Sequence, residues 1–373
     1  MAAVRKRPGQ QRVDGTVGPD RWVTSWRDPA GKPVTKTFAT RREAEAHRNR
    51  IGQELDTGSY LDVSRGRVTV REYGEAWRAI QVWRPGTQER VDSVLRNHIY
   101  PTFGDHRLAA IRPTHVQAWI KKLEATLAPA TVKIVHTNFS SLMKAAVVDE
   151  AIRSNPCHGI DLPETHEVEV VPPTVGQVHA IYDHIFGLYR VTVRLASGLG
   201  LRSGEVRGLT VDRVDFLRRT VKVDRQAVEV RGAGMGFGPP KTKASNRTIP
   251  LPDSVAEDMA RHIARYGLGD HGAIVHSEAG RMVRRGQLAA VLHTAVARAA
   301  QAGTAMPVAP MRPHHLRHFY ASMLIDEGLH PKVIQKRLGH KSITETMDTY
   351  GHLWPSSDSQ TIDAVDRAMR REA

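Results

Sequence analysis

The stretch "RPHHLRH", residues 312–318, carries two arginines and three histidines within seven positions. Each of these side chains is cationic or becomes so by taking up a proton. Such a stretch is a solvated surface, a site that faces a strongly negative group, or a set of histidines that holds a metal. His314 and His318 stand one helical turn apart, as zinc ligands do, but the glutamate of a zinc hydrolase motif is missing. Arg317 would also lie beside any bound cation, so we expect an anion at this turn, and neither a metal ion nor a cofactor.

The composition supports a negative partner for the chain as a whole. Its 373 residues include 54 Lys and Arg against 39 Asp and Glu, a formal net charge of +15. An excess of this size favours nucleic acid, because a basic surface releases condensed counterions when it binds a polyanion. The alternative is a merely soluble basic protein. The single cysteine, Cys157, allows no intrachain disulfide and no thiolate metal cluster.

The sequence also bears on where the protein works. No run approaches the roughly 18 apolar residues of a membrane span. The start "MAAVRKRPGQ" is basic but lacks the apolar segment of a signal peptide. We therefore expect a cytoplasmic protein with no membrane partner.

The first 60 residues form a small pattern of their own. The segments "RWVTSWRD" (21–28) and "PVTKTF" (33–38) alternate like strands, and "DPAGK" (28–32) supplies a turn between them. Thr40 and Glu43 form a capping box that opens a helix. A hairpin with one helix is either a minor subdomain or a DNA-contacting module whose strands enter a groove. The net charge of the chain favours the second interpretation.

Residues 66–160 have helical periodicity throughout. Thr69 with Glu72 makes a second capping box. After the helices, the proline-rich segment 154–173 breaks the periodicity and predicts a linker. The expected helices cover residues 70–80, 87–99, 114–125 and 129–152.

The remaining segment, 171–373, is mixed. Thr174 with Gln177 caps a helix, and short strands are expected at 211–216 and 219–225. A hairpin is expected between "GFGPPKT" (236–242) and "NRTIPLP" (246–252), and the chain then becomes helical to its end. The predicted fold class is therefore multidomain α+β. It consists of a small hairpin and helix domain (1–60), an all-α domain (66–160) and a mainly α domain with a small β-sheet (171–373).

Three further basic residues could contact an anion. Arg202 directly precedes Ser-Gly-Glu at an expected helix start, where backbone N–H groups and the helix dipole favour negative charge. Glu205 could brace Arg202 from behind, although an ordinary capped helix with a solvated arginine explains the pattern equally well. Lys241 and Lys243 lie at the tip of the expected hairpin, where a mobile ammonium group could reach a site or simply remain solvated.

A last candidate region is "RLGHKSITETMDTYGHL", residues 337–353. Gly339 ends one helix, and Ser342 with Glu345 forms a capping box that opens the next. His340 lies between the two helices, and Tyr350 lies near the far end of the second. Taken alone, Tyr350 could be an ordinary half-buried packing residue.

Taken together, these segments resemble the tyrosine recombinase (phage integrase) family. The resemblance rests on four motifs that occur in the family's order, and it spans residues 174–353. The helical block upstream resembles the family's core-binding domain, and the first 60 residues resemble the amino-terminal domain by which lambda-type integrases bind arm sites. The motifs are "GLGLRSGEVRGL" (198–209), "HHLRHFYAS" (314–322), "RLGH" (337–340) and "ITETMDTYGH" (343–352).

The resemblance implies that the anion is a scissile DNA phosphate. Tyr350 would be the nucleophile that forms a 3′-phosphotyrosyl bond and frees a 5′-hydroxyl. Arg202 and Arg317 would clamp the non-bridging phosphate oxygens and stabilise the charge of the transition state.

The same resemblance assigns the remaining roles. Lys241 would be the general acid that protonates the 5′-oxygen, with Lys243 as the alternative. His314 would assist proton transfer, His340 would hydrogen-bond the phosphate, and Glu205 would support the arrangement without taking part in the chemistry. Base-contacting residues cannot be assigned, because arginines and lysines that read bases look no different in sequence from those that contact phosphates.

The implied function is a site-specific recombinase that integrates and excises a phage or an integrative element without metal or ATP. Its partners would be double-stranded DNA attachment sites in the nucleoid and, because two duplexes need four active sites, three further copies of the chain in a homotetramer. A DNA-bending protein and an excision factor are potential further partners, and residues 356–373 could form a helix that docks on a neighbouring copy. The alternatives are a non-catalytic DNA-binding regulator on the same fold and a nicking-closing enzyme of the type IB topoisomerase kind.

Overall fold

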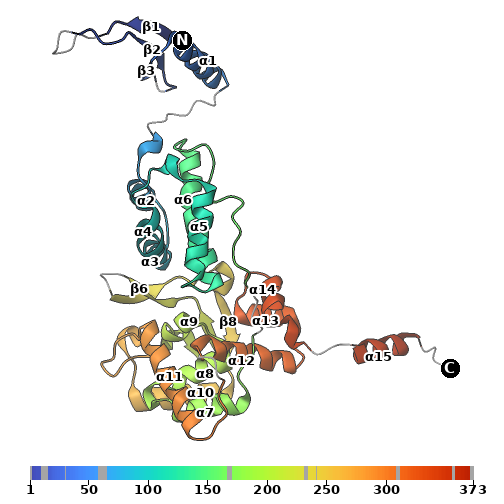
Figure 1. Ribbon diagram of the computed structural model, residues 1–373. Helices are drawn as coiled ribbons and strands as arrows, with labels where there is room; N and C mark the ends of the chain where they lie inside the picture. The colour runs from blue at the N-terminus through green and yellow to red at the C-terminus, as the bar shows by residue number, and fades with distance from the viewer. Residues whose placement is uncertain are drawn as a thin grey trace. The chain divides into compact units, whose positions relative to one another are not determined.

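The computed structural model shows a chain that divides into two compact units, Met1–His166 and Glu167–Ala373 (Figure 1). None of the helices within the described residues is both long and apolar enough to cross a membrane. The structure describes residues 2–9, 16–29, 31–57, 65–165, 170–230, 234–240, 242–307, 311–354 and 358–369.

The first unit begins with a three-stranded antiparallel sheet in the order β1-β2-β3, followed by helix α1. The predicted hairpin is present as β2 and β3, and Thr40 and Glu43 form the predicted capping box. Strand β1 was not predicted from the sequence, because "AVRKR" is mostly basic and lacks the alternation of apolar and polar residues that marks a half-buried strand. The elements are β1 (Ala3–Arg7), β2 (Arg21–Arg27), β3 (Pro33–Phe38) and α1 (Arg41–Asp56).

The rest of the first unit is helical, as predicted. Its core contains the stacked rings of Phe103 and Phe139, with ring centroids 4.9 Å apart. The helix expected to stop at residue 99 instead continues through a π-helical turn (Leu95–Ile99), and Pro101 lies in the first turn of α4, where a missing N–H is tolerated. The helices are α2 (Val70–Ala79), α3 (Pro85–Val94), α4 (Tyr100–Phe103), α5 (Pro113–Glu124) and α6 (Pro129–Val148).

The second unit is built mainly of helices around α8, which packs against α7, α10 and α12. The apolar face of α8 lies at the centre of the unit's largest core cluster. These helices are α7 (Val175–His184), α8 (Arg190–Leu199), α9 (Ser203–Arg207), α10 (Asp253–Tyr266), α11 (Arg285–Gln301), α12 (Pro313–Asp326), α13 (Pro331–Leu338), α14 (Ile343–Tyr350) and α15 (Asp358–Met369).

Two small antiparallel sheets complete the second unit, and they correct one prediction. The expected hairpin between residues 236–242 and 246–252 does not form, because β7 pairs with β6 whereas β8 pairs with β5. Pro239 and Pro240 end β7, since proline cannot donate to a strand ladder, and the chain crosses to the other sheet. The strands are β4 (Val214–Asp215), β5 (Thr220–Val223), β6 (Gln226–Val230), β7 (Gly234–Gly238) and β8 (Arg247–Pro250).

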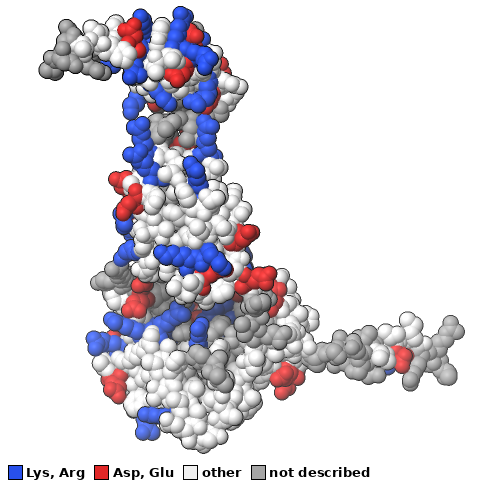
Figure 2. All heavy atoms as spheres, viewed as in Figure 1, with Lys and Arg blue, Asp and Glu red and all other residues white. Residues whose placement is uncertain are grey.

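Basic side chains are prominent on the surface. Lys and Arg are spread along the visible face of the first unit (Figure 2). In the second unit they gather near α9 and the β6–β7 hairpin, and much of the remaining visible face is uncharged (Figure 2). On this face of the second unit, the basic side chains are therefore concentrated rather than evenly spread (Figure 2).

Candidate active site

Arg202 lies at the start of α9, as the sequence predicts. Gly200 ends α8 in the left-handed conformation (φ 63°), so the chain turns sharply before Arg202 caps α9 with extended backbone angles. The Arg202 guanidinium donates to Glu205 Oε1, to Ser245 Oγ and to the Gly339 carbonyl, each at 3.1 Å. These contacts join segments more than 130 residues apart in the sequence and hold the arginine in one orientation.

Glu205 is a buried counter-charge for more than one arginine. Besides the Arg202 bond, its carboxylate accepts hydrogen bonds from Arg247 at 2.9 and 3.2 Å. Burial works to raise the pKa of Glu205, but the hydrogen bonds and charge of Arg247, with the charges of Arg317 and Arg202, hold that pKa below its ordinary value. The predicted supporting role of Glu205 is thus extended to Arg247, which the sequence analysis missed. The alternation of Arg247 with Ile249 and Leu251 on one face of β8 was the signal that could have found it.

Arg317 is fully buried, with 0% of its surface exposed. Its two terminal nitrogens donate to the carbonyls of Gly200 and Leu338, each at 2.7 Å, and its Nε has no hydrogen-bond partner among the described residues. Burial and then the charge of Arg202 lower the pKa of Arg317 to about 9. The guanidinium groups of Arg202 and Arg247 therefore bond to the Glu205 carboxylate, and the charge of Arg317 also acts on it. The net positive charge favours a bound anion.

His314 and His340 approach this cluster from two sides. His314 lies in the first turn of α12, where part of its surface remains exposed to solvent. Packing of its ring against neighbouring groups removes some of its hydration, and this effect, followed by the charge of Arg317, lowers the pKa of His314 to about 4. His340 is buried between α13 and α14, with its Nδ1 2.9 Å from the Thr346 hydroxyl. Burial, followed by the charge of Arg317, lowers its pKa to about 3, so this ring is neutral near pH 7.

Tyr350 is the last residue of α14 and is only 1% exposed. Its ring stacks on His340 with centroids 6.3 Å apart, and its hydroxyl lies 2.8 Å from His318 Nδ1. Burial raises the pKa of Tyr350 to about 12, although the charges of Arg317 and Arg202 act to lower it. The structure thus brings Tyr350 to the arginines, together with His318, a contact that sequence reasoning did not identify.

The loop before α14 is fixed by Gly339 and Ser342. Gly339 ends α13 at φ +67°, and a Cβ there would lie 3.0 Å from the Ser245 Cα atom. The Ser342 hydroxyl caps α14 by accepting from the Glu345 N–H, as predicted. The second half of the predicted capping box is wrong, because the Glu345 carboxylate accepts from the Lys341 N–H at 3.0 Å instead. This arrangement holds His340 beside Tyr350.

The two candidate lysines fall on the connection between the sheets. Lys241 lies outside the described residues. Lys243 is exposed at the start of a short turn (Lys243–Ser245), and Ser245 of the same turn is buried against Arg202. The connection therefore reaches the arginine cluster, and the preference for Lys241 over Lys243 stays a prediction.

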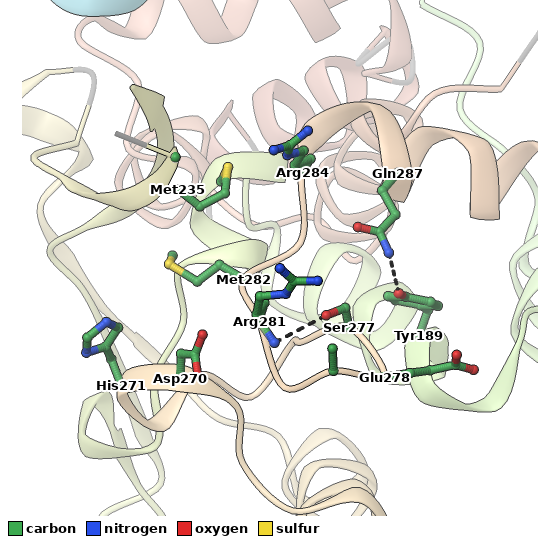
Figure 3. A pocket seen from close by; sticks show the side chains of 12 residues that line it. Tyr189, Met235, Asp270, His271, Ser277, Glu278, Arg281, Met282, Arg284 and Gln287 are labelled. Atoms are coloured by element: carbon green, nitrogen blue, oxygen red, sulfur yellow. Dashed lines mark hydrogen bonds between the residues drawn. The ribbon is translucent and has the colours of Figure 1, made fainter. Parts of the chain in front are cut away.

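Within the ranges that the structure describes, no group of three or more His, Cys, Asp or Glu side chains could hold a metal ion. A cavity of about 690 Å³ lies away from the arginine cluster, between β7, the segment 270–282 and the start of α11 (Figure 3). It is lined by Tyr189, Met235, His271 and Arg284 among others, and by none of the candidate residues.

Replacing Glu205 with alanine is expected to cost about 3–5 kcal/mol of the free energy of unfolding, because it leaves the buried guanidinium of Arg247 without its counter-charge. Glu205→Gln keeps the shape and part of the hydrogen bonding, so its cost is expected to be smaller. Urea unfolding measures both. The exposed Glu257→Ala on α10 is the control and should change stability by less than about 0.5 kcal/mol. Equal stabilities for Glu205→Ala and Glu257→Ala would contradict the role of Glu205.

The free energy of unfolding should fall as the pH drops below about 6.5. The folded-state pKa values of His318 and His340 are both lowered to about 3, mainly by burial, whereas in the unfolded chain both titrate near 6.5. Between these values the unfolded chain binds more protons, so stability is retained above pH 6.5 and lost toward pH 5, by up to about 1.4 kcal/mol per pH unit for each histidine. Urea unfolding at pH 7.5, 6.5 and 5.5 should show a shallower dependence for His318→Asn than for the unsubstituted protein. Identical slopes would refute this assignment.

The chain is similar to known proteins over most of its length. Residues 174–356 match the phage integrase family and residues 68–161 match the phage integrase central domain. The chain is 26% identical to the XerC-like tyrosine recombinase of Caldanaerobacter subterraneus subsp. tengcongensis, over 92% of this chain and 94% of that protein. It is 27% identical to the integrase of Mycobacterium phage D29, over 73% of this chain and 72% of that protein.

Solved structures show the same fold, which confirms the predicted fold class. The Tn1549 transposon integrase in complex with transposon right end DNA superimposes with a TM-score of 0.71 and 20% identity, covering 81% of this chain and 100% of that one. A lambda integrase tetramer bound to a Holliday junction superimposes with a TM-score of 0.59 and 19% identity, covering 89% of this chain and 92% of that one. The matches to both family models, together with the fold, show that this chain belongs to the phage integrase family of tyrosine recombinases.

Proposed function

We propose that this protein is a site-specific DNA recombinase that cleaves and rejoins attachment sites through a 3′-phosphotyrosyl intermediate, and so integrates and excises a phage or an integrative element. One observation carries the proposal. The arginines at 202 and 317 lie close enough for their charges to act on both the buried carboxylate of Glu205 and the tyrosine at 350, although these residues are separated by up to 148 positions in the sequence. A phosphodiester is the anion that such a cluster, placed beside a phenol, can both bind and attack.

The chemistry that we propose uses only groups of the protein. The Tyr350 oxygen attacks the phosphorus, and Arg202 and Arg317 stabilise the charge on the non-bridging oxygens. Lys241 protonates the departing 5′-oxygen, while His314 assists proton transfer and His340 hydrogen-bonds the phosphate. Because the phosphotyrosyl bond preserves the energy of the cleaved phosphodiester, rejoining is the same reaction in reverse and requires no ATP.

The buried position of Tyr350 adds a step to this scheme. A side chain that is 1% exposed cannot reach a DNA phosphate without movement. Since Tyr350 ends α14, a small shift of that short helix would open the site to a phosphate while the Tyr350 hydroxyl keeps its contact with His318 of α12. We propose that DNA binding favours this shift, because a phosphate placed between Arg202 and Arg317 neutralises the charge that the cluster otherwise concentrates.

The proposed assembly is a homotetramer on DNA. The lambda integrase structure named above is a tetramer bound to a Holliday junction. In this chain, Ile362, Val365 and Met369 are exposed on one face of α15 and could pack on a neighbouring copy. A DNA-bending protein and an excision factor remain proposed partners.

The proposed domains are those predicted from the sequence: an arm-site-binding domain (1–60), a core-binding domain (66–160) and a catalytic domain (171–373). The central-domain match at residues 68–161 supports the bounds proposed for the core-binding domain.

Covalent capture of DNA tests the proposal. A duplex from the element's own junction, nicked just beyond the cleavage point so that the short product diffuses away, is incubated with the protein in EDTA and without ATP. Denaturing gels should show protein attached to DNA. Tight, specific binding without any attached protein would instead support the non-catalytic DNA-binding regulator. Relaxation of supercoiled plasmids lacking an attachment site would support the topoisomerase alternative.

A further inference from the structure

The hydroxyl group of Tyr350 has one hydrogen-bond partner among the described residues, and it belongs to none of the predicted roles. His318 Nδ1 lies 2.8 Å from the Tyr350 oxygen, within ordinary hydrogen-bond distance. Both side chains are buried, at 8% and 1% exposure, so bulk water has little access to the phenolic proton. A nucleophile that must lose its proton is therefore in contact with an imidazole rather than with water.

The surroundings of His318 favour an acceptor at Nδ1. Its ring packs edge-on against His314 with centroids 4.5 Å apart, and His315 and Arg317 lie on the same helix. Burial and then the charges of His314, His315 and Arg317 lower the pKa of His318 to about 3, which keeps the ring neutral near pH 7. In the tautomer that carries its proton on Nε2, Nδ1 has a lone pair directed at the phenol. The second nearby imidazole, His340, already uses its Nδ1 for Thr346.

We propose that His318 is a further catalytic residue, which accepts the phenolic proton of Tyr350 through Nδ1 as the tyrosine oxygen attacks the phosphorus. This role rests on the proposed function. The O–H bond of Tyr350 breaks as the bond from its oxygen to phosphorus forms. The bond from phosphorus to the 5′-oxygen breaks, and that oxygen takes a proton from the general acid proposed at Lys241. In the rejoining reaction, His318 returns its proton to the tyrosine oxygen that leaves.

The electrostatics of DNA binding make the proton transfer feasible at the required moment. In the free protein, burial disfavours a protonated His318 most, and the charges of His314, His315 and Arg317 add to this effect. A phosphodiester bound between Arg202 and Arg317 adds negative charge beside the imidazole, which raises the basicity of the ring. His318 is thus a better proton acceptor when the substrate is in place.

The test compares two substitutions at His318 on two substrates. His318→Ala removes both the hydrogen bond and the acceptor. His318→Asn places an amide oxygen near the position of Nδ1, so it can accept the hydrogen bond but cannot take the proton. The substrates are the nicked duplex and the same duplex with sulfur in place of the bridging 5′-oxygen, a leaving group that needs no general acid. His293→Ala is the matched control, since its imidazole is exposed on α11 and does not contact Tyr350 or His318.

Both His318 variants are expected to form the covalent product about 10²–10³-fold more slowly than the unsubstituted protein, on both substrates. Lys241→Ala should regain activity on the sulfur substrate, and His293→Ala should remain within about threefold of the unsubstituted protein. Thermal unfolding and DNA binding check that each variant is folded. If His318→Ala does not fold, the capture rate of His318→Asn alone tests the role of His318.

Three results would overturn the inference. An asparagine variant as fast as the unsubstituted protein would reduce His318 to a positioning contact. Rescue of the His318 variants by the sulfur substrate would move the residue to the leaving-group side, and unchanged rates would remove it from the reaction. A failure of the unsubstituted protein to form any covalent product would instead overturn the proposed function, and this role with it.

Discussion

Tyr350→Phe is expected to lower the rate of covalent DNA capture by about 10⁴-fold or more, to the limit of detection, because it removes the attacking oxygen and leaves the rest of the cluster in place. DNA binding should change little, since the phenolic hydroxyl is buried and makes its hydrogen bond to His318. Single-turnover capture on the nicked duplex, at saturating protein, measures the effect.

A second tyrosine provides the control for this substitution. Tyr189 is also buried, and its hydroxyl accepts one hydrogen bond, from Gln287 at 2.9 Å, beside the cavity shown in Figure 3. Tyr189→Phe should therefore match Tyr350→Phe in lost hydrogen bonding, yet keep the capture rate within about threefold. Retention of capture by Tyr350→Phe would remove Tyr350 from the chemistry.

Arg317→Lys is expected to slow capture by about 10³-fold, the second large effect, because lysine lacks the planar fork that arginine presents. The Arg317 guanidinium binds the carbonyls of Gly200 and Leu338 through two separate nitrogens. A lysine has one nitrogen on a shorter side chain, so it cannot span both carbonyls and also present a fork to a phosphate. One buried carbonyl would lose its partner, so the free energy of unfolding should also fall by about 1–3 kcal/mol.

Capture rate and urea unfolding together separate the two consequences of Arg317→Lys. Arg298→Lys is the control, because it makes the same substitution at an exposed position of α11, remote from the cluster. It should change neither the capture rate nor the free energy of unfolding measurably. A variant that is destabilised by the expected amount but captures DNA at the normal rate would show that Arg317 serves the fold and not the reaction.

Local signals predicted much of the helical architecture. The capping boxes at Thr40, Thr69 and Thr174 are all present, because a threonine followed three residues later by Glu or Gln satisfies two N–H groups wherever a helix begins. Such signals depend on neighbouring residues alone. These signals can therefore be recognised without any information about tertiary structure.

Strand pairing was less accessible from sequence. The segments around β7 and β8 look like the two arms of a hairpin, yet each pairs with a different earlier strand. Strand partners are chosen by packing and by the crossing of the chain between sheets, neither of which a local pattern contains. The basic strand β1 was missed for a related reason, since its side chains are exposed almost throughout and only its pairing with β2 makes it a strand.

The candidate site shows the same division. Arg202, Arg317, His340 and Tyr350 were selected from short motifs, and the structure brings them together. Arg247 and His318 were not selected, because what matters about them is a partner 42 or 32 residues away in the sequence: Glu205 for the arginine and Tyr350 for the histidine. Contacts between residues this far apart in the sequence follow from tertiary packing and cannot be predicted from any single motif.

The most direct test of the central claim is to locate the amino acid that becomes attached to DNA. After capture on the nicked duplex in EDTA, the complex is digested with trypsin and nuclease, and the nucleotide-bearing peptide is sequenced by mass spectrometry. The peptide Ser342–Arg367, with the added nucleotide mass on Tyr350, is the predicted result. Attachment at any other residue, or specific binding with no attached nucleotide at all, would contradict the account.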